Sequence, residues 1–166
     1  MYIDTSLLVP CYGPEVLSQA AERTLRGDPG PALSDLVEVE FFSALANKVR
    51  TREMSAADAI RTGERFLDHL QGGFYLRIAV QRRHHETARG WLARFTLPLR
   101  ALDALHLALA DREGLRLATS DYDLSRSAKS LGVAVTLVRR EGRRSEERRV
   151  GKECTSWCRS RWSPYH

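Results

Sequence analysis

Short apolar segments alternate along this chain with longer stretches of helical periodicity, and this alternation restricts the fold more than any other feature. The strand-like segments are residues 2–3, 32–33, 74–79, 115–118 and 133–138. The helix-like segments are residues 14–26, 36–50, a segment between Ser55 and Gly72-Gly73, residues 80–95, 100–112 and a short one ending near Leu131. Because parallel strands need long crossover connections, the pattern predicts an α/β fold, a three-layer α/β/α sandwich with a short central parallel sheet.

The spacing of apolar residues also predicts which face of a helix is buried. In the helix over residues 36–50, the predicted inward residues are Leu36, Val39, Phe42, Ala46 and Val49. In the helix that follows Ser55, the predicted apolar stripe consists of Ile60, Phe66, Leu67 and Leu70. Both helices are therefore expected to pack these faces into the core.

The net charge of +5 sits entirely in the last 28 residues of the chain. Residues 1–138 hold 17 Lys+Arg and 17 Asp+Glu, whereas residues 139–166 hold 9 and 4. The overall charge of the first part is therefore no evidence for nucleic-acid binding. A neutral domain is still compatible with a local basic patch.

From Arg139 onward the sequence loses its helical periodicity and almost all aliphatic residues, so it is a poor builder of a hydrophobic core. It resembles translated vector or adapter sequence. We therefore expect residues 1–138 to form one domain and residues 139–166 to be a non-native or disordered basic tail. A native basic arm that contacts RNA or a partner protein is the alternative.

Several classes of protein are disfavoured by what the sequence lacks. No apolar stretch approaches the roughly 18–20 residues of a membrane-spanning helix, and the start shows no signal-peptide pattern, so we expect a cytoplasmic protein without membrane contact. The three cysteines, Cys11, Cys154 and Cys158, do not form the pattern of a disulfide framework or zinc site. There is no glycine-rich phosphate loop, no His-x-x-x-His pair and no nucleophile elbow.

Four acidic residues occupy places where a solvated charge is not expected. Asp4 and Asp121 follow strand-like segments, while Glu40 and Asp103 interrupt apolar helical stretches. The carboxyl ends of parallel strands form the ligand-binding edge of such sheets. A buried, unpaired carboxylate costs several kcal/mol or takes up a proton, and a divalent cation shared by several acids removes this cost. The four acids therefore predict a Mg²⁺ or Mn²⁺ site.

Taken singly, each acid also has a purely structural explanation. The two that follow strands would cap the next helix or form a turn, and Glu40 would be a half-exposed helix residue. Asp103 would pair with Arg100 or His106 on its own helix. Only the four acids together favour a shared cation.

In their local sequences these acids resemble the PIN-domain family, and most closely its toxin ribonucleases of the VapC-like type. The start YIDTSLLV resembles the family's opening strand with Asp4 as first acid, and SDLVEVEFFSALANKVR resembles the helix that carries the second, Glu40. LRALDALHLALA is similar to the helix of the third acid, Asp103. LATSDYDLSRSAKSLGVAV resembles the closing unit with Asp121 and an extra acid, Asp123. The resemblance covers residues 1 to about 138.

This resemblance implies a PIN-like nuclease domain over residues 1–138, hydrolysis of RNA phosphodiester bonds with Mg²⁺ or Mn²⁺, and a role as an endoribonuclease toxin. It implies that Asp4, Asp103 and Asp121 hold the metal. Glu40 would share that role or orient the attacking water, and Asp123 would complete a second, weaker metal site. The family also implies a homodimer and a cognate antitoxin protein.

Two hydroxyl residues and one apolar region have less certain roles by the same resemblance. Thr119 and Ser6 would hydrogen-bond a carboxylate or the scissile phosphate, although a helix cap or turn is the favoured explanation for each. Phe41, Phe42 and Ala44-Leu45, with the helix over residues 55–70, suit an apolar groove for an antitoxin helix, but the same residues also serve as core.

Two other functions remain as alternatives. The first is a catalytically inactive PIN-like domain that binds RNA or a partner, which the presence of all four acids disfavours. The second is a receiver-type domain, which needs a pair of acids after the first strand and a lysine after the last. Here only Asp4 follows the first strand, and the lysines of residues 1–138 are Lys48 and Lys129.

Overall fold

The computed structural model of the protein describes residues 1–13 and 15–139, and every structural statement below concerns these residues. The predicted tail of residues 139–166 lies outside the described residues, except for Arg139.

The described residues contain a five-stranded, all-parallel sheet in the order β3-β2-β1-β4-β5. Its strands are β1 Tyr2–Ile3, β2 Ala32–Ser34, β3 Leu76–Ile78, β4 Leu117–Thr119 and β5 Val135–Leu137. Every residue of β1, β2 and β4 is buried, as expected for strands covered on both faces. The predicted α/β fold with a short central parallel sheet is confirmed.

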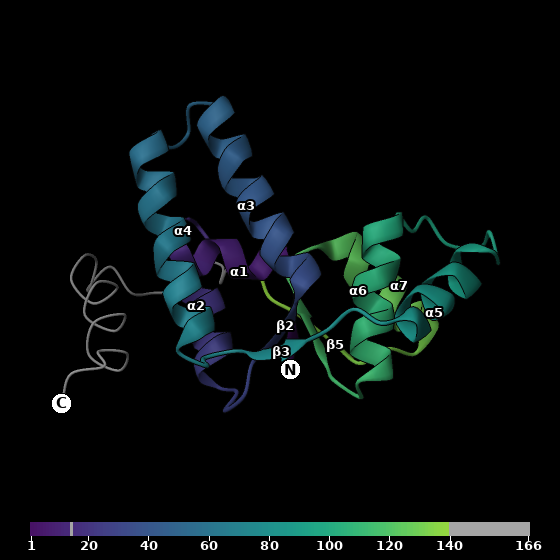
Figure 1. Ribbon diagram of the computed structural model, residues 1–166. Coiled ribbons are helices and arrows are strands. Elements are labelled where there is room, and N and C mark those ends of the chain that lie inside the picture. Colours follow the sequence, from purple (N-terminus) through teal and green to yellow (C-terminus); the bar gives the residue numbers. More distant parts are fainter. Residues whose placement is uncertain (14, 140–166) are drawn as a thin grey trace, which may run out of the picture.

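Helices surround this sheet (Figure 1). They are α1 Thr5–Tyr12, α2 Ser18–Arg26, α3 Asp35–Arg50, α4 Ala56–Gln71, α5 Arg82–Leu92, α6 Ala101–Arg112 and α7 Tyr122–Leu131. Ser55 caps α4 as predicted, because its Oγ accepts a hydrogen bond of 3.1 Å from the backbone N–H of Asp58. None of the helices in the described part of the chain is long and apolar enough to cross a membrane.

Helix α1 was not predicted by the periodicity of the sequence. Leu7, Leu8 and Val9 are all buried in it, so the helix has no solvated face and no amphipathic repeat. Pro10 also lies inside α1, where a proline disfavours a helical prediction.

The predicted inward face of α3 is wrong. Val37, Phe41 and Leu45 form its buried row, whereas Val39 and Phe42 are 68% and 38% exposed. Two apolar rows run along this helix, and the periodicity alone does not say which one meets the sheet. In α4 the predicted stripe is confirmed at Phe66 and Leu70, which are buried, and wrong at Ile60, which is 61% exposed.

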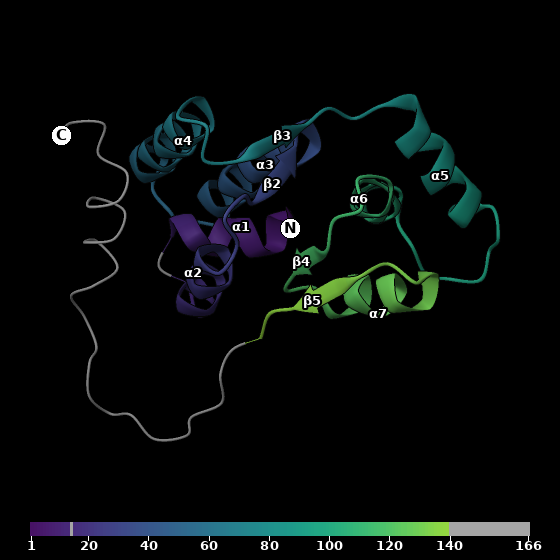
Figure 2. The same cartoon turned by 90° about the horizontal axis from the view of Figure 1, so that it is seen from below.

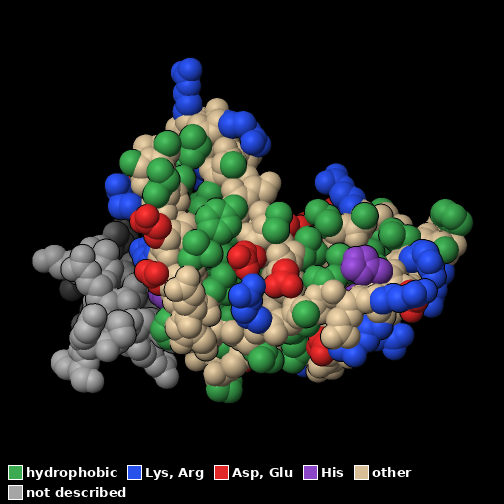
Figure 3. Space-filling view, viewed as in Figure 1, with side chains coloured by type: hydrophobic (Ala, Val, Ile, Leu, Met, Phe, Trp, Pro, Cys, Tyr) green, Lys and Arg blue, Asp and Glu red, His purple; other side chains and the backbone are tan. Residues whose placement is uncertain are grey.

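Two helix pairs flank a gap above the sheet. Figure 1 shows α3 and α4 side by side on one side, and α5 and α6 together on the other, in agreement with the contacts between the members of each pair. Figure 2 shows α7 beside β4 and β5. In the space-filling view, the surface is hollowed between the two pairs, and acidic side-chain atoms are visible at the base of the hollow (Figure 3).

The strand order reverses direction at β1, and this switch point lies beneath the hollow. The chain steps from β1 to β2 and β3 in one direction, then returns to add β4 and β5 on the other side of β1. Such a reversal opens a crevice beyond the carboxyl ends of the two strands at the switch, here β1 and β4. Asp4 directly follows β1, and Asp121 lies just beyond β4.

Candidate active site

Asp4 is the most buried acid of the candidate site, with 5% of its surface exposed. It stands at the N-cap position of α1, but its side chain makes no capping hydrogen bond, so the helix-cap explanation does not hold. Its Oδ2 instead accepts hydrogen bonds from Ser6 Oγ at 2.6 Å and Thr119 Oγ1 at 2.7 Å. Both hydroxyls therefore orient the carboxylate of Asp4, a role that the sequence left as the less favoured one.

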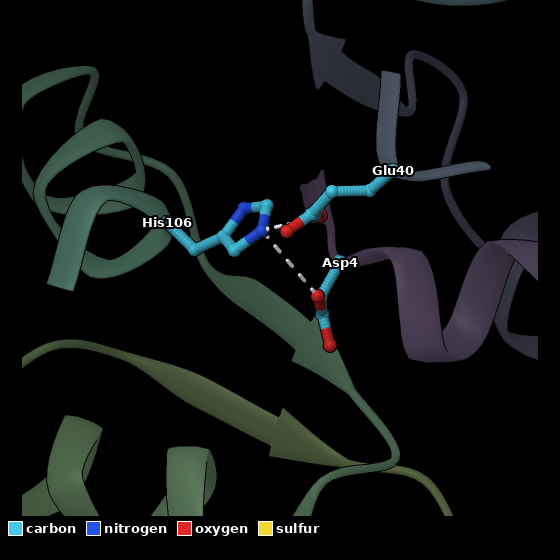
Figure 4. A group of neighbouring side chains, drawn as sticks. All are labelled: Asp4, Glu40 and His106. Atoms are coloured by element: carbon cyan, nitrogen blue, oxygen red, sulfur yellow. Dashed lines mark hydrogen bonds and ion pairs between the residues drawn. The ribbon is translucent and has the colours of Figure 1, made fainter. Parts of the chain in front are cut away.

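Glu40 reaches the same place from the first half of α3 (Figure 4). Its Oε2 accepts hydrogen bonds from Thr5 Oγ1 at 2.5 Å and from His106 Nε2 at 2.8 Å. Burial acts to raise the pKa of Glu40, but the hydrogen bond and charge of His106, together with the Thr5 hydroxyl, outweigh it and lower this pKa. Glu40 is therefore a carboxylate at neutral pH.

His106 is the site residue that the sequence did not predict. It lies on α6, is 2% exposed, and directs Nε2 toward Glu40 and, at 3.8 Å, toward Oδ1 of Asp4 (Figure 4). Each of Asp4, Glu40 and His106 offers one atom that could bind a metal ion, and these three atoms lie within 4.8 Å of one another. The available signal was the spacing Asp103-x-x-His106, which puts both side chains on one face of a helix.

The other ring nitrogen of His106 is tied to the sheet. Its Nδ1 lies 2.8 Å from the hydroxyl of Tyr2, which lies 2.8 Å from Ser34 Oγ. Burial, with the charges of Asp4 and Glu40 and against the Ser34 hydrogen bond, raises the pKa of Tyr2 far above its ordinary value. Tyr2 is therefore a neutral phenol that links the histidine to the sheet.

Asp103 and Asp121, the other two predicted acids, do not belong to the group formed by Asp4, Glu40 and His106. Asp103 lies one turn before His106 and caps α6, with its Oδ2 3.4 Å from the Arg100 backbone N. Burial and the charge of Asp121 raise the pKa of Asp103, although the Arg100 hydrogen bond and His106 oppose this shift. The negative charge of Asp121 is therefore unfavourable for an ionised Asp103.

Asp121 itself caps α7, because its Oδ1 accepts a 2.9 Å hydrogen bond from the backbone N–H of Leu124. Among the described residues, no hydrogen bond or ion pair joins Asp123 to the other acids. Its side chain is 74% exposed and pairs with Arg126 at 3.1 Å.

The four predicted acids share one pattern of hydrogen bonding. Each uses one oxygen for the protein: Oδ2 of Asp4, Oε2 of Glu40, Oδ2 of Asp103 and Oδ1 of Asp121. No residue among 1–13 and 15–139 donates a hydrogen bond to the other oxygen of any of them. Carboxylates that are held by one oxygen and accept no hydrogen bond at the other suit a hard divalent cation, which prefers oriented oxygen ligands. Oδ1 of Asp4 has one charged neighbour, His106 Nε2, at 3.8 Å.

The raised pKa of His106 leads to a first testable prediction. Burial acts to lower this pKa, but the hydrogen bond to Glu40 and the charges of Asp4, Glu40 and Asp103 raise it above the ordinary 6.5. In a chelator, the stabilisation from charged His106 is then fully present below about pH 6.5 and lost as pH rises through the raised pKa. Urea unfolding of wild type and His106→Gln should give a stability difference that shrinks between pH 6 and pH 9. A difference that grows with pH would contradict this sign.

Comparison with known proteins identifies the family. A model of the PIN domain matches residues 1–130. Ribonuclease VapC46 of Mycobacterium tuberculosis is 35% identical over 138 residues, covering 81% of this chain and 95% of that protein. The crystal structure of VapC20 from the same species, a toxin that cleaves the sarcin-ricin loop, has a TM-score of 0.60 at 19% identity, covering 76% of this chain and 93% of that one. FitAcB of Neisseria gonorrhoeae has a TM-score of 0.61 at 18% identity, covering 81% and 94%. The chain belongs to the PIN-domain family.

Proposed function

We propose that this protein is a Mg²⁺- or Mn²⁺-dependent endoribonuclease that hydrolyses RNA phosphodiester bonds, and that it is the toxin of a toxin–antitoxin pair. The observation that carries the proposal is a set of carboxylates near the switch point of the sheet, each of which has one oxygen hydrogen-bonded to the protein and the other without a hydrogen bond from the described residues. The name of VapC46 as a ribonuclease supports the same activity.

In this proposal Asp4, Glu40, Asp103 and Asp121 hold the metal through their open oxygens. When bound, the ion polarises the scissile phosphate and lowers the pKa of a water molecule. The repulsion between Asp103 and Asp121 favours the cation, because a positive charge between them removes it. Asp123 contributes to a second, weaker site, since it must first leave Arg126.

The residues around the acids keep these ligands in place. Ser6 and Thr119 fix the plane of the Asp4 carboxylate from α1 and β4. The backbone N–H of Asp4 also donates to the carbonyl of Ala118 at 3.0 Å, which joins the ends of β1 and β4. Such rigid support is what a reaction needs when its ligands must hold their geometry to within about 0.5 Å.

RNA has access to this site through the hollow between the two helix pairs. Lys and Arg side chains project on both sides of that hollow in Figure 3, where they are suited to contact phosphates. Residues 1–138, with 17 basic and 17 acidic residues, are neutral as a whole and yet present basic side chains around the hollow.

The test is cleavage of a panel of structured RNAs by the full chain, with Mg²⁺, Mn²⁺ or a chelator. We expect cleavage that requires the metal and is restored when metal exceeds chelator. Metal binding without cleavage of any RNA would favour the alternative of an inactive PIN-like domain that binds RNA or a partner. Absence of metal binding would reject the carboxylate site itself.

We further propose that the protein forms a homodimer and binds a cognate antitoxin. The exposed row of α3, with Val39 68% exposed, and Ile60 of α4, 61% exposed, supply apolar surface for such contacts. Sedimentation of the purified chain is expected to give about twice the monomer mass of 18.8 kDa. A monomer at all accessible concentrations would reject the dimer.

A further inference from the structure

We propose that His106 is a positioning residue, which holds Oε2 of Glu40 and thereby turns Oε1 of Glu40 toward the metal. This inference rests on the proposed metal-dependent cleavage, and it assigns to His106 a role distinct from that of a ligand.

Glu40 is held at one oxygen by two donors from different helices. Thr5 of α1 and His106 of α6 both reach Oε2, at 2.5 Å and 2.8 Å. A glutamate has three side-chain torsions, and two donors on one oxygen select a single arrangement of them. In that arrangement Oε1 is the oxygen that accepts nothing from the described residues, so it is the one available to a cation.

His106 is itself fixed by a buried chain of polar groups. Its Nδ1 is hydrogen-bonded to the Tyr2 hydroxyl, and that hydroxyl is hydrogen-bonded to Ser34 Oγ, each at 2.8 Å. His106, Tyr2 and Ser34 are 2%, 0% and 1% exposed, and they come from α6, β1 and the end of β2. Because Tyr2 pairs with both β2 and β4, its backbone lies at the centre of the sheet. These hydrogen bonds therefore link Glu40, on α3, to the central strand of the sheet.

The same contacts indicate that His106 is a hydrogen-bond donor to Glu40 and not a metal ligand. In either charge state of the imidazole, Nε2 carries a proton or a lone pair, so it either donates to Glu40 or binds a metal. Nε2 lies 2.8 Å from the carboxylate oxygen that also accepts from Thr5, which is the geometry of a donated hydrogen bond. Mg²⁺ also selects oxygen over imidazole nitrogen. We therefore assign Nε2–H to Glu40 and leave the cation to the carboxylates.

The decisive measurement follows the Nε2 proton and does not require cleavage. In the full chain labelled with ¹⁵N-histidine, His106 is assigned by the signal missing from His106→Gln. We expect Nε2 to remain protonated when Mg²⁺ saturates the protein. Loss of that proton, with Nε2 shifting to the position of a metal-bound nitrogen, would make His106 a ligand and overturn the inference. Because this result is independent of RNA, it decides the role of His106 even if no substrate is cut.

A comparison of variants then tests the consequence for the reaction. His106→Ala removes the donor, and we expect kcat to fall by about 10- to 100-fold, the range for outer partners of metal ligands, with KM changed less than about threefold. His106→Gln replaces the imidazole N–H with an amide N–H and should recover most of this loss. Equal kcat values for the Ala and Gln variants would reject positioning, while leaving the nuclease proposal intact.

The structural control for these variants is His84, another fully buried histidine. It lies on α5, is 0% exposed, and has its Nε2 3.0 Å from Oε1 of Glu113. His84→Ala should lower the melting temperature about as much as His106→Ala but leave kcat unchanged at a temperature where both variants are folded. A matching fall in kcat for His84→Ala would show that general loss of stability, and no positioning, explains the result.

Discussion

Replacement of Asp103 by Asn is expected to reduce metal-dependent RNA cleavage by about 100-fold or more while leaving the domain folded. In the native protein, the backbone N–H of Arg100 donates a capping hydrogen bond of 3.4 Å to Asp103. The amide oxygen of Asn can still accept this hydrogen bond. The change removes a negative charge from the proposed metal site, so the cation binds less tightly and stabilises less charge in the transition state. Initial rates over a Mg²⁺ titration measure both effects.

The same substitution is expected to stabilise the metal-free protein. Burial and the charge of Asp121 raise the pKa of Asp103, so the ionised pair is unfavourable without a cation. Asn removes this repulsion, and the melting temperature in a chelator should rise while activity falls. Such opposite signs are the mark of a residue kept for function at a cost in stability.

Asp111 supplies the matched control for this prediction. It is an exposed aspartate on the same helix α6, two turns beyond Asp103. Asp111→Asn makes the same chemical change, and it should alter neither cleavage nor the Mg²⁺ dependence. Full activity of Asp103→Asn, or an equal loss in Asp111→Asn, would remove Asp103 from the proposed site.

The four acids of the candidate site could be selected from the sequence because of where they stand, although their role as metal ligands stays a prediction. Asp4 and Asp121 follow strands, and Glu40 and Asp103 interrupt apolar helices, so local sequence carries the signal. His106 was missed because its role depends on Tyr2, a residue 104 positions away in the sequence. A hydrogen bond across such a separation leaves no local pattern, and the sequence around His106 indicates only a helix neighbour of Asp103.

Most of the fold was predictable from local sequence as well, but the prediction missed one helix and the buried face of another. Strands buried on both faces are short and apolar, and helices with one solvent-exposed face have a helical repeat of apolar residues. Most helices and strands can therefore be predicted from the sequence. Helix α1 has no wet face, and α3 carries two apolar rows. The choice between those rows is made by packing against α1, α4 and the sheet, which lies beyond the reach of periodicity.

Phe41→Ala is expected to destabilise the domain by about 3–5 kcal/mol, whereas Phe42→Ala should cost about 1 kcal/mol. Phe41 is 0% exposed and packs between Tyr12 and Phe66, with ring centroids at 5.2 and 4.3 Å. Truncation leaves a cavity that rigid neighbours do not fill. Phe42 is 38% exposed and contacts α4 at Gly63, so its removal opens onto solvent. Urea denaturation of the two variants beside wild type measures the difference.

This pair of variants decides between the two apolar rows of α3 because the side chains are identical and adjacent. A domain of this size is stabilised by only about 5–15 kcal/mol, so the loss at Phe41 consumes a large share of the total. If Phe42→Ala were the more damaging change, the row of Val39 and Phe42 would be the inward one, and α3 would be rotated about its axis. Such a rotation would also carry Glu40 away from Thr5 and His106, because Glu40 lies beside Phe41 on the same turn. The stability of two phenylalanine variants therefore tests the geometry of the proposed metal site without any measurement of catalysis.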